Sequence, residues 1–514
     1  MFTKQKPWVP KSRPKAEVIR RTVTVPRTPT PGSTSRNSTP TGTSIPPSRP
    51  SSTNRKRTAD GRSRATASPF ATSSSADELR GNGSRQHLAV PSSSSSSSQP
   101  KKRIRSPATD SARVVFDESD GDEEEEDLDE LFTKRQKTNG RIDEDRKLRN
   151  AALTELAEAG YTDKPGRSLK FVHARDVVGL AHGDAKVFPD ASDEDSAIEL
   201  QYPGSLTRER FELVNQKDKL DVIKDIIRVV KNVRDTYITN KAVQDEFDDN
   251  IIRKLERNSN AKILNIAAFR EAIDKYNHTV LHHLKSGAIM AAIDAQHEVP
   301  NNLVKHILNQ VYDRVVTPKV DLLKKYDNGT DNVYGEMNKI FITQILCRDL
   351  HMSSKDVFVD LGSGVGNVVL QAALQIGCES WGFEMMDAPS TLAKAQYQEF
   401  KARCKLWGIQ PGKVRLMQGD FRTHKEIGVL QRADVVLANN QAFTPDLNDR
   451  LKIMFLDLKQ GCRIASLKTF ATASKYNEND IANSILTEPV KYRWPAKGVS
   501  WTDAMGDYYI TKKK

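Results

Sequence analysis

The feature that most constrains the fold is a regular alternation of short apolar segments with helical segments from Asp356 onward. The segments with strand character are residues 357–359, 380–383, 414–417, 434–437 and 463–466. Strands that alternate with helices predict βαβ units and a parallel sheet. Right-handed crossovers then place the carboxyl ends of the strands at one edge, where ligands bind in such folds.

A glycine-rich loop follows the first of these strands. The loop reads Asp360, Leu361, Gly362, Ser363, Gly364, Val365, Gly366 and Asn367. Glycines let the backbone turn tightly and let a ligand approach the start of the next helix. A dinucleotide fingerprint requires glycine where Asn367 stands, and a P-loop requires a Gly-Lys-Ser/Thr sequence that is missing here. An acid before the loop, Asp360, would repel a pyrophosphate but suits the amino-acid end of S-adenosyl-L-methionine, which carries net positive charge.

The next two strands also end in acidic residues. Glu384 ends the second strand, where a carboxylate can bind ribose hydroxyls. Asp420 and Phe421 follow the third, and suit the amino group and the face of an adenine. Acids at three successive strand ends therefore predict S-adenosyl-L-methionine as the cofactor. The alternative is that they only cap the following helices.

Methyl transfer to an amine requires orientation and a neutral acceptor, and neither a metal ion nor a covalent nucleophile. An apolar, aromatic channel lowers the pKa of a lysine and so favours the neutral amine. Amides and an aromatic ring follow the fourth strand, and further aromatic residues lie near the end of the chain, although ordinary core packing would also explain each ring. The candidates are Asn439, Asn440, Phe443, Trp501, Tyr508 and Tyr509.

The chain before the predicted sheet divides into three parts by pattern. Apolar residues recur at steps of three and four within 213–227, 247–255, 263–284 and 303–316, which predicts a helical subdomain over residues 205–325. Residues 151–204 are a poorly patterned transition, and residues 326–514 form the predicted methyltransferase domain. We expect no metal site, because the neighbouring His282 and His283 would point to different faces of a helix.

Residues 1–150 are predicted to be a disordered arm. Pro, Ser, Thr, Arg and Lys dominate, and residues 92–98 are all serine, so the segment cannot bury enough surface to offset its ordering entropy. Basic clusters occur at 55–57, 101–105 and 134–137, and an acidic run occupies 117–130. The clusters favour nuclear import and contact with DNA. The acidic run could be a solvated spacer, a histone-docking segment or a mask for the basic arm.

Charge and cysteine content indicate the cellular compartment and the kind of partner. The net charge of +12 predicts a polyanionic partner such as DNA, chromatin or an anionic membrane surface. The first residues carry no apolar signal segment, and no apolar run is long enough to cross a membrane. The four cysteines form no CxxC pair, so we expect free thiols in a reducing compartment of the cell.

Taken together, these motifs resemble the disruptor-of-telomeric-silencing (DOT) family of histone H3 lysine-79 N-methyltransferases, in its fungal layout. The resemblance covers roughly residues 202–509 and rests on residues 333–336, 359–366, 382–384, 419–421 and 439–443. It implies a class I, seven-strand, Rossmann-like methyltransferase domain (not a SET domain), with a preceding helical subdomain and a long arm. It also implies a loop that closes over the cofactor, so the cofactor-binding candidates become Tyr334, Gly335, Glu336, Met337, Asp360, Leu361, Gly362, Ser363, Gly364, Gly366, Asn367, Glu384, Asp420 and Phe421.

The resemblance further implies the partners and the cellular role. The substrate would be histone H3 in the nucleosome, with contacts to histone H4 and ubiquitinated H2B, and with DNA through the basic arm. Expected roles are telomeric silencing, chromatin regulation and the DNA damage checkpoint in the nucleus, with no membrane partner. The sequence departs from other members at Asn367, where some have glutamine, and at Gln441, where others have an aromatic residue.

Two other functions compete with this interpretation. Adenine-N6 and protein-glutamine methyltransferases use an Asn-Pro-Pro-aromatic motif after the fourth strand, and residues 439–443 lack both prolines. A chromatin-binding scaffold without catalysis would be expected to have broken cofactor motifs, and these are intact. Both remain as alternatives to the lysine methyltransferase.

Overall fold

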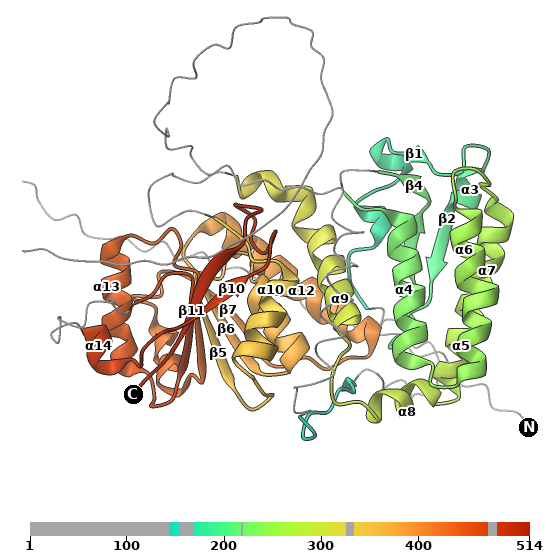
Figure 1. Ribbon diagram of the computed structural model, residues 1–514. Coiled ribbons are helices and arrows are strands. Elements are labelled where there is room, and N and C mark those ends of the chain that lie inside the picture. The colour runs from blue at the N-terminus through green and yellow to red at the C-terminus, as the bar shows by residue number, and fades with distance from the viewer. Residues whose placement is uncertain (1–142, 152, 154–168, 217–218, 325–333, 471–480) are drawn as a thin grey trace, which may run out of the picture. The chain divides into compact units, whose positions relative to one another are not determined.

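The computed structural model describes residues 143–514 except 152, 154–168, 217–218, 325–333 and 471–480 (Figure 1). The described residues all fall within one compact unit. Most of the predicted arm, with its basic clusters and its acidic run, lies outside the described residues. No helix among the described residues is long and apolar enough to span a bilayer.

A seven-stranded sheet dominates the carboxyl-terminal part of the chain, with the order β10-β11-β9-β8-β5-β6-β7. Counted along the chain, this is the order 3-2-1-4-5-7-6 read from the β7 edge. Five strands are parallel, and β11 and β10 complete the sheet in antiparallel pairing. The strands are β5 (Val357–Leu361), β6 (Glu379–Glu384), β7 (Val414–Gln418), β8 (Val435–Ala438), β9 (Arg463–Ser466), β10 (Val490–Trp494) and β11 (Gly506–Lys512).

The five parallel strands confirm the strands predicted from the sequence, and the order confirms the predicted class I methyltransferase fold. The apolar pattern did not predict β10 and β11. In β10, exposed residues such as Lys491 and Arg493 alternate with more buried ones, as is usual for an edge strand that must avoid pairing with other chains.

Alternate residues of the central strands pack on opposite faces of the sheet. In β5, Phe358 belongs to a cluster with α12, whereas Val359 and Leu361 belong to a cluster with α13. Both faces are therefore covered, as a buried parallel sheet requires. The α-helices of this part are α10 (Lys339–Thr343), α11 (Asn367–Gln371), α12 (Asp387–Trp407), α13 (Pro445–Met454) and α14 (Ile481–Ile485). The segments η5 (Gln344–Asp349) and η6 (Ala372–Ile376) are π-helical, and η7 (Lys425–Arg432) and η8 (Phe455–Asp457) are 3-10 helices.

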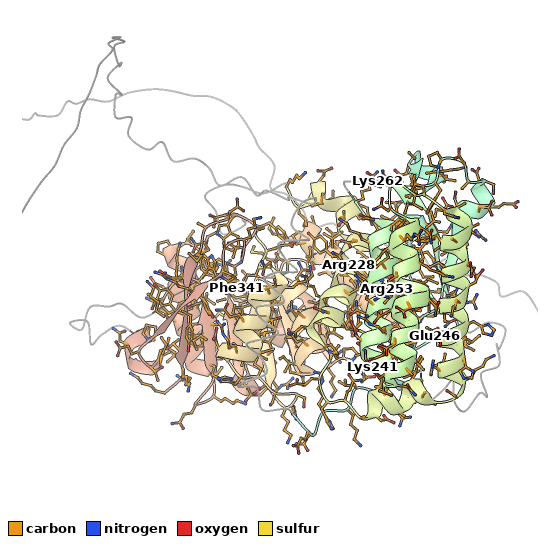
Figure 2. All side chains as sticks on the ribbon, turned by 45° about the vertical axis from the view of Figure 1, so that its right-hand side comes forward. Arg228, Lys241, Glu246, Arg253, Lys262 and Phe341 are labelled. Carbon is orange, nitrogen blue, oxygen red and sulfur yellow. The ribbon has the colours of Figure 1, made fainter. Side chains whose placement is uncertain are left out.

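Helices also dominate the part before the sheet (green in Figure 1). These helices bury apolar side chains such as Val229 and Phe269. They expose charged side chains such as Lys241, Glu246 and Arg253 (Figure 2). They are α4 (Val222–Tyr237), α5 (Lys241–Phe247), α6 (Arg253–Asn258), α7 (Ile266–Lys285), α8 (Ala288–Asp294) and α9 (Asn301–Val315), with turns η3 (Asp248–Ile252) and η4 (Thr317–Leu322).

The helical pattern at 247–255, 263–284 and 303–316 is confirmed, but the prediction at 213–227 is wrong in its first half. Val214 lies in a short strand, and α4 begins only at Val222 because the side chain of Asp221 accepts a hydrogen bond from the backbone N–H of Lys224. The poorly patterned transition contributes small hairpins and turns. These are η1 (Ala174–Asp176), η2 (Leu180–His182), β1 (Ala185–Lys186), the short helix α3 (Asp193–Ser196) and β2 (Ala197–Leu200). Their partner strands β3 (Glu209–Glu212) and β4 (Val214–Asn215) lie within the predicted helical subdomain, where no strand was predicted.

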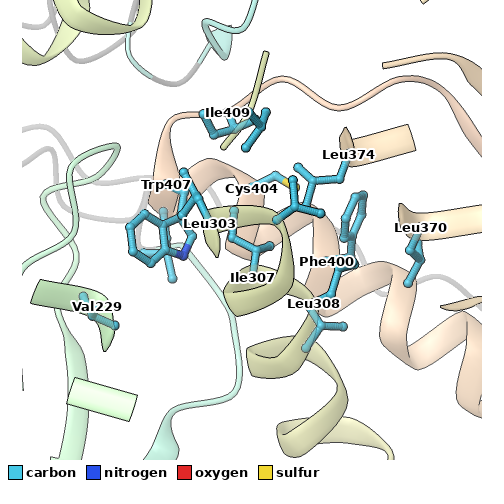
Figure 3. Packing of buried hydrophobic residues seen from close by; sticks show 14 of the residues in the cluster. Val229, Leu303, Ile307, Leu308, Leu370, Leu374, Phe400, Cys404, Trp407 and Ile409 are labelled. Carbon is cyan, nitrogen blue, oxygen red and sulfur yellow. The ribbon is translucent and has the colours of Figure 1, made fainter. Parts of the chain in front are cut away.

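The helical part and the sheet part share one hydrophobic core. Helix α9 packs along α12, with Leu303 and Ile307 of α9 in the same cluster as Phe400 and Trp407 of α12 (Figure 3). The indole N–H of Trp407 donates to Oε1 of Gln310 at 3.0 Å. The interface between the two parts is therefore core, not surface.

A buried ionic cluster joins the same two parts. The fully buried carboxylate of Glu209 accepts hydrogen bonds from Arg314 of α9 at 2.9 Å and from Arg403 of α12 at 2.8 Å. Burial alone would raise the pKa of Glu209, but the two guanidinium groups lower it to about 2. The carboxylate is thus charged and paired, which is the condition for a stable ion pair in a core.

A short strap (residues 143–151 and 153) docks on the sheet part and corrects the predicted extent of the arm. The guanidinium of Arg146 donates to the backbone carbonyls of Leu374 and Gln375, and Asn150 bonds the backbone of Gly408 and Ile409. Leu148 and Leu153 are buried. These acceptors precede β6 and β7, so the strap lies at the amino edge of the sheet.

Candidate cofactor-binding site

A pocket lies at the carboxyl edge of the sheet, where β5 has β6 on one side and β8 on the other. It is lined by the loop after β5, by Glu384 at the end of β6 and by Asn439 after β8. Such a point, where the strand order reverses direction, is the usual ligand site of an open α/β sheet.

The loop after β5 depends on glycine for its shape. Gly362, Gly364 and Gly366 have φ values of +90°, +55° and +91°, a region that other residues seldom adopt. The backbone N–H of Gly364 donates to Oε2 of Glu384 at 2.9 Å, and the N–H groups of Gly362 and Ser363 donate to the carbonyl of Phe383. The end of β6 therefore holds the loop in position.

Acidic groups dominate the polar lining of the pocket. Asp360 is only 2% exposed, and burial together with the nearby Glu384 raises its pKa to about 8. Burial also raises the pKa of Glu384, against hydrogen bonds from backbone N–H groups that lower it. Burial raises the pKa of Glu336 too. Carboxyl groups held in this way gain stabilisation of their charged forms from a ligand that carries positive charge.

A cover segment (residues 334–338) borders the pocket and is fixed by a support loop (residues 497–501). The N–H of Glu336 donates to Oγ of Ser500 at 2.9 Å, and the N–H of Ser500 returns a bond to the carbonyl of Glu336 at 2.9 Å. Met337 and Val499 form an isolated bridge. A Cβ on Gly335 would lie 2.7 Å from the ring of Trp501, so the two segments fit only with glycine at this position.

The two asparagines after β8 lie in different surroundings. Asn439 lines the pocket, with its Nδ2 3.4 Å from the carbonyl of Gly335. Asn440 is fully buried, donates to Asn448 and to the carbonyl of Lys468 at 3.0 Å each, and accepts from the N–H of Lys468. Phe443 lines the pocket close to Gly362. Asn439 and Phe443 can therefore meet a ligand, whereas Asn440 ties β8 to the chain after β9.

Comparison with known proteins places the chain in a family. The profile of the family described as "Histone methylation protein DOT1" matches residues 312–513. A protein of Gibberella zeae named "Histone-lysine N-methyltransferase, H3 lysine-79 specific" is 47% identical over 425 residues, which cover 81% of this chain and 83% of that protein. The chain belongs to the DOT1 histone methylation family.

Other relatives with the same name agree with this assignment. The protein of Chaetomium globosum is 51% identical over 74% of this chain and 73% of its own, and that of Aspergillus fumigatus is 41% identical over 81% and 83%. Among solved structures, an RNA methyltransferase of Salinibacter ruber in complex with S-adenosyl-L-homocysteine aligns with 34% of this chain and 92% of its own, at 20% identity and a TM-score of 0.24. The fold assignment therefore rests on the sheet order of this chain.

In this DOT1 protein, the pocket brings together most of the residues predicted to bind the cofactor, from segments far apart in the sequence. These residues are Tyr334, Gly335, Glu336, Met337, Asp360, Gly362, Ser363, Gly364, Asn367, Glu384 and Phe421. Their role in binding stays a prediction.

Three of the predicted cofactor residues do not line the pocket. Leu361 is fully buried in the core beneath the loop. Gly366 precedes α11 and supplies a positive φ, with the side chain of Leu416 about 3.1 Å from where its Cβ would stand. Asp420 is held by Arg422, whose Nε lies 2.9 and 2.8 Å from the two carboxylate oxygens, so Phe421 but not Asp420 faces the pocket.

The aromatic residues near the end of the chain also lie outside the pocket lining. Trp501 supports the cover segment from outside the pocket lining. Tyr508 is fully buried, donates to Asp349, accepts from Nε2 of Gln344 and does not line the pocket, and its role in a lysine channel stays a prediction. Tyr509 lies opposite Ser466 in the sheet register and does not line the pocket.

The sequence interpretation missed the apolar part of the lining. Phe383, Met385, Met386 and Leu447 contribute to the pocket together with Val365 and Val368. The only signal for the first three was their position around Glu384 at a strand end. Leu447 follows Phe443 in the first turn of α13, and its place could have been inferred only from the direction of that helix.

Proposed function

We propose that this protein transfers methyl groups from S-adenosyl-L-methionine to lysine 79 of histone H3 in nucleosomes. The observation that carries the proposal is the acidic pocket at the switch point of the sheet in a chain that belongs to the DOT1 family. The names of the relatives supply the substrate lysine.

The pocket residues suit this cofactor by charge and by shape. S-adenosyl-L-methionine, when bound, supplies an electrophilic methyl group on a sulfonium. Asp360 and Glu336 would stabilise the positive charge of its amino-acid end, and Glu384 would accept hydrogen bonds from ribose hydroxyls. Phe421 and Phe383 would contact the adenine ring.

The acceptor lysine must reach the pocket as a neutral amine. The lining near Asn439 includes the apolar side chains of Phe443, Met337 and Leu447, and desolvation by such groups lowers the pKa of a lysine. The side-chain oxygen of Asn439 could accept a hydrogen bond from the amine without adding charge. We therefore assign orientation of the acceptor to Asn439 and Phe443, in place of Asn440.

The wider setting of the proposal is the chromatin of the nucleus. The basic clusters of residues 55–57, 101–105 and 134–137 would give salt-sensitive, sequence-independent affinity for nucleosomal DNA. Contacts with histone H4 and ubiquitinated H2B, and roles in telomeric silencing and the DNA damage checkpoint, complete the proposal.

The proposal is tested with labelled S-adenosyl-L-methionine and recombinant nucleosomes, followed by mapping of the label by mass spectrometry. The wild type is compared with Gly364→Arg, in which a new side chain starts 2.9 Å from the ring of Tyr334 on a backbone with φ of +55°. Gly428→Arg is the matched control, because a Cβ at Gly428 would meet no atom of the described residues within 4 Å beyond its own chain neighbours.

Label on lysine 79 of H3 in the wild type and in Gly428→Arg, but not in Gly364→Arg, is the expected result. Label on another histone lysine would contradict the assigned target while keeping the cofactor site. Label on naked DNA would favour the adenine-N6 alternative. A wild type that neither binds the cofactor nor labels any substrate would favour the non-catalytic scaffold.

A further inference from the structure

Side chains from three separate segments donate hydrogen bonds to the carboxylate of Glu336. Tyr312 of α9 donates its hydroxyl to Oε1 at 3.1 Å, and the hydroxyl of Tyr334 donates to the same oxygen. Asn367, at the start of α11, donates its Nδ2 to Oε2 at 3.0 Å. A residue of the helical part thus bonds directly to a carboxylate of the pocket.

The partners of Glu336 are themselves fixed. Gln396 of α12 donates its Nε2 to Oδ1 of Asn367 at 3.2 Å and to the carbonyl of Val365 at 2.8 Å, which orients the amide group of Asn367 toward Glu336. Tyr312 stands on α9, and α9 packs closely against α12. The arrangement is therefore preorganised by the core that the two parts share.

A carboxylate offers about four acceptor positions, two on each oxygen. The two tyrosines fill both positions of Oε1 and Asn367 fills one position of Oε2, so among the residues that the structure describes one position of Oε2 has no donor. Glu336 lines the pocket, so a donor on the ligand can use that position. Three donors that converge on one carboxyl group also favour its ionised form.

We propose that Tyr312 is a positioning residue for the cofactor, which keeps the Glu336 carboxylate charged and directs its free acceptor position toward the cationic end of S-adenosyl-L-methionine. This inference rests on the proposed function. It makes the helical part a component of the cofactor site, beyond its contribution to the core.

Several ionisable groups act on Glu336 or share its pocket. Tyr312 faces it from α9, Lys339 from α10 and Tyr334 from the cover segment, and Asp360 and Glu384 line the same pocket. Burial raises the pKa of Glu336, and the tyrosine hydroxyls and the Lys339 ammonium oppose the rise. Loss of the Tyr312 hydroxyl should therefore raise the pKa of Glu336 further.

The experiment measures the dissociation constant of S-adenosyl-L-methionine by calorimetry, from pH 6 to pH 9, for the wild type and Tyr312→Phe. Because Asp360 and Glu384 titrate in both proteins, the informative quantity is the ratio of the two affinities at each pH. We expect the variant to bind more weakly throughout, because the carboxylate loses one of the groups that orient it, and the ratio of affinities to grow as the pH falls. At low pH the variant should bind about tenfold more weakly or worse, the size of a hydrogen bond to a charged group.

Two further variants separate positioning from packing. Tyr276→Phe is the control for loss of a tyrosine hydroxyl elsewhere, because the hydroxyl of Tyr276 donates a hydrogen bond at 2.9 Å to the carbonyl of Gln201, away from the pocket lining. It should lower the melting temperature without a pH-dependent loss of affinity. In a Glu336→Gln background, Tyr312→Phe should cause no further pH-dependent loss, because no charge remains to be stabilised.

The outcomes distinguish this inference from the proposed function. A wild type that does not bind the cofactor overturns the proposed function. If the wild type binds normally and the two affinities are equal from pH 6 to pH 9, the positioning role of Tyr312 is overturned and the proposed function is not. If Tyr276→Phe and Tyr312→Phe change the affinity for the cofactor to the same extent, the positioning role of Tyr312 is overturned as well.

Discussion

Asp360 is a carboxyl group in a position where ionisation is costly. It ends β5 with 2% of its surface exposed, next to Glu384, and its pKa is raised to about 8. At neutral pH the group is therefore mostly protonated without a ligand. A cationic ligand would favour the ionised form, so binding and proton release should be coupled.

The first prediction concerns the pH dependence that follows from Asp360. In the wild type, affinity for S-adenosyl-L-methionine should rise as the pH increases through about 8, because the carboxylate form binds the cation. In Asp360→Asn, this part of the increase should disappear and affinity should fall at least tenfold, since a charge-assisted interaction is lost. Calorimetry at several pH values measures both effects.

The same substitution should stabilise the free protein. Because the pKa is higher in the folded state than in the unfolded one, the folded state binds more protons, and the free energy of unfolding falls as the pH rises from about 4 to about 8. Asp360→Asn removes this loss, so its melting temperature without ligand should exceed that of the wild type at pH 8. An unchanged or lower melting temperature would contradict the assignment of a costly buried carboxyl group.

Asn439 and Asn440 show how far residue roles can be predicted from the sequence. Both follow β8, and the pattern could not decide which side chain faces the ligand. The structure places Asn439 in the pocket and gives Asn440 three hydrogen bonds in the core. The roles differ because successive residues at a strand end point to different sides, and a difference of one residue in register exchanges them.

The second prediction separates the two asparagines. Asn440→Ala should lower the free energy of unfolding by about 1–3 kcal/mol, because it leaves buried partners without hydrogen bonds. Asn439→Ala should leave stability nearly unchanged and lower methyl transfer. Denaturant unfolding and a methylation assay give the two readouts, and equal destabilisation by both variants would show that the assignment is wrong.

At the scale of elements, the parallel strands and most helices followed from apolar periodicity, whereas the antiparallel edge did not. Strands β5 and β8 are nearly continuous apolar runs because both of their faces are buried. Strand β10 lies at the edge and carries exposed charges. Only one of its five residues is buried, so its apolar pattern does not distinguish an edge strand from a loop.

The cover segment was recognised only through resemblance, because its structure depends on a contact across a long stretch of sequence. Its glycine is explained by Trp501, and its backbone bonds are made to Ser500. A local pattern contains no information about a partner more than 160 residues away. Arg422 lies only two residues from Asp420, but the apolar pattern did not reveal that its side chain bonds the carboxylate and that Asp420 stays outside the pocket lining.

The third prediction tests the contact between the cover segment and the support loop. In Gly335→Ala the new Cβ would lie 2.7 Å from the ring of Trp501, which forces the two segments apart. We expect weaker binding of S-adenosyl-L-methionine with little change in the melting temperature. Gly428→Ala, where no atom lies within 4 Å of the new Cβ, is the control and should bind as the wild type does.

At the scale of the whole molecule, the strap extends the folded unit upstream of the predicted boundary at residue 150. The sequence placed Arg146 and Leu148 in the arm, because a short segment with many charges has the composition of the arm. The strap is held in place by hydrogen bonds to the chain at the ends of η6 and α12. No local sequence pattern reveals these contacts.

The fourth prediction compares two truncated proteins. A protein that begins at Asp143 should melt at the temperature of the full chain and bind the cofactor equally well, while its affinity for DNA falls. A protein that begins at residue 154 should melt at a clearly lower temperature, because it loses the burial of Leu148 and Leu153, each of which contributes about 1.5–3 kcal/mol. Equal melting temperatures for both would contradict a structural role of the strap.

The burial of Arg403 and Trp407 against the helical part has a practical consequence for inhibitor discovery. A recombinant fragment limited to residues 326–514 contains every pocket residue discussed above, and would be an attractive small target for screening. Without Glu209, however, the guanidinium of Arg403 would lose its main partner, and the indole of Trp407 would lose its bond to Gln310. Compounds selected against such a fragment would meet newly exposed apolar and cationic surface that the intact protein never presents, and many would bind there instead of in the cofactor pocket.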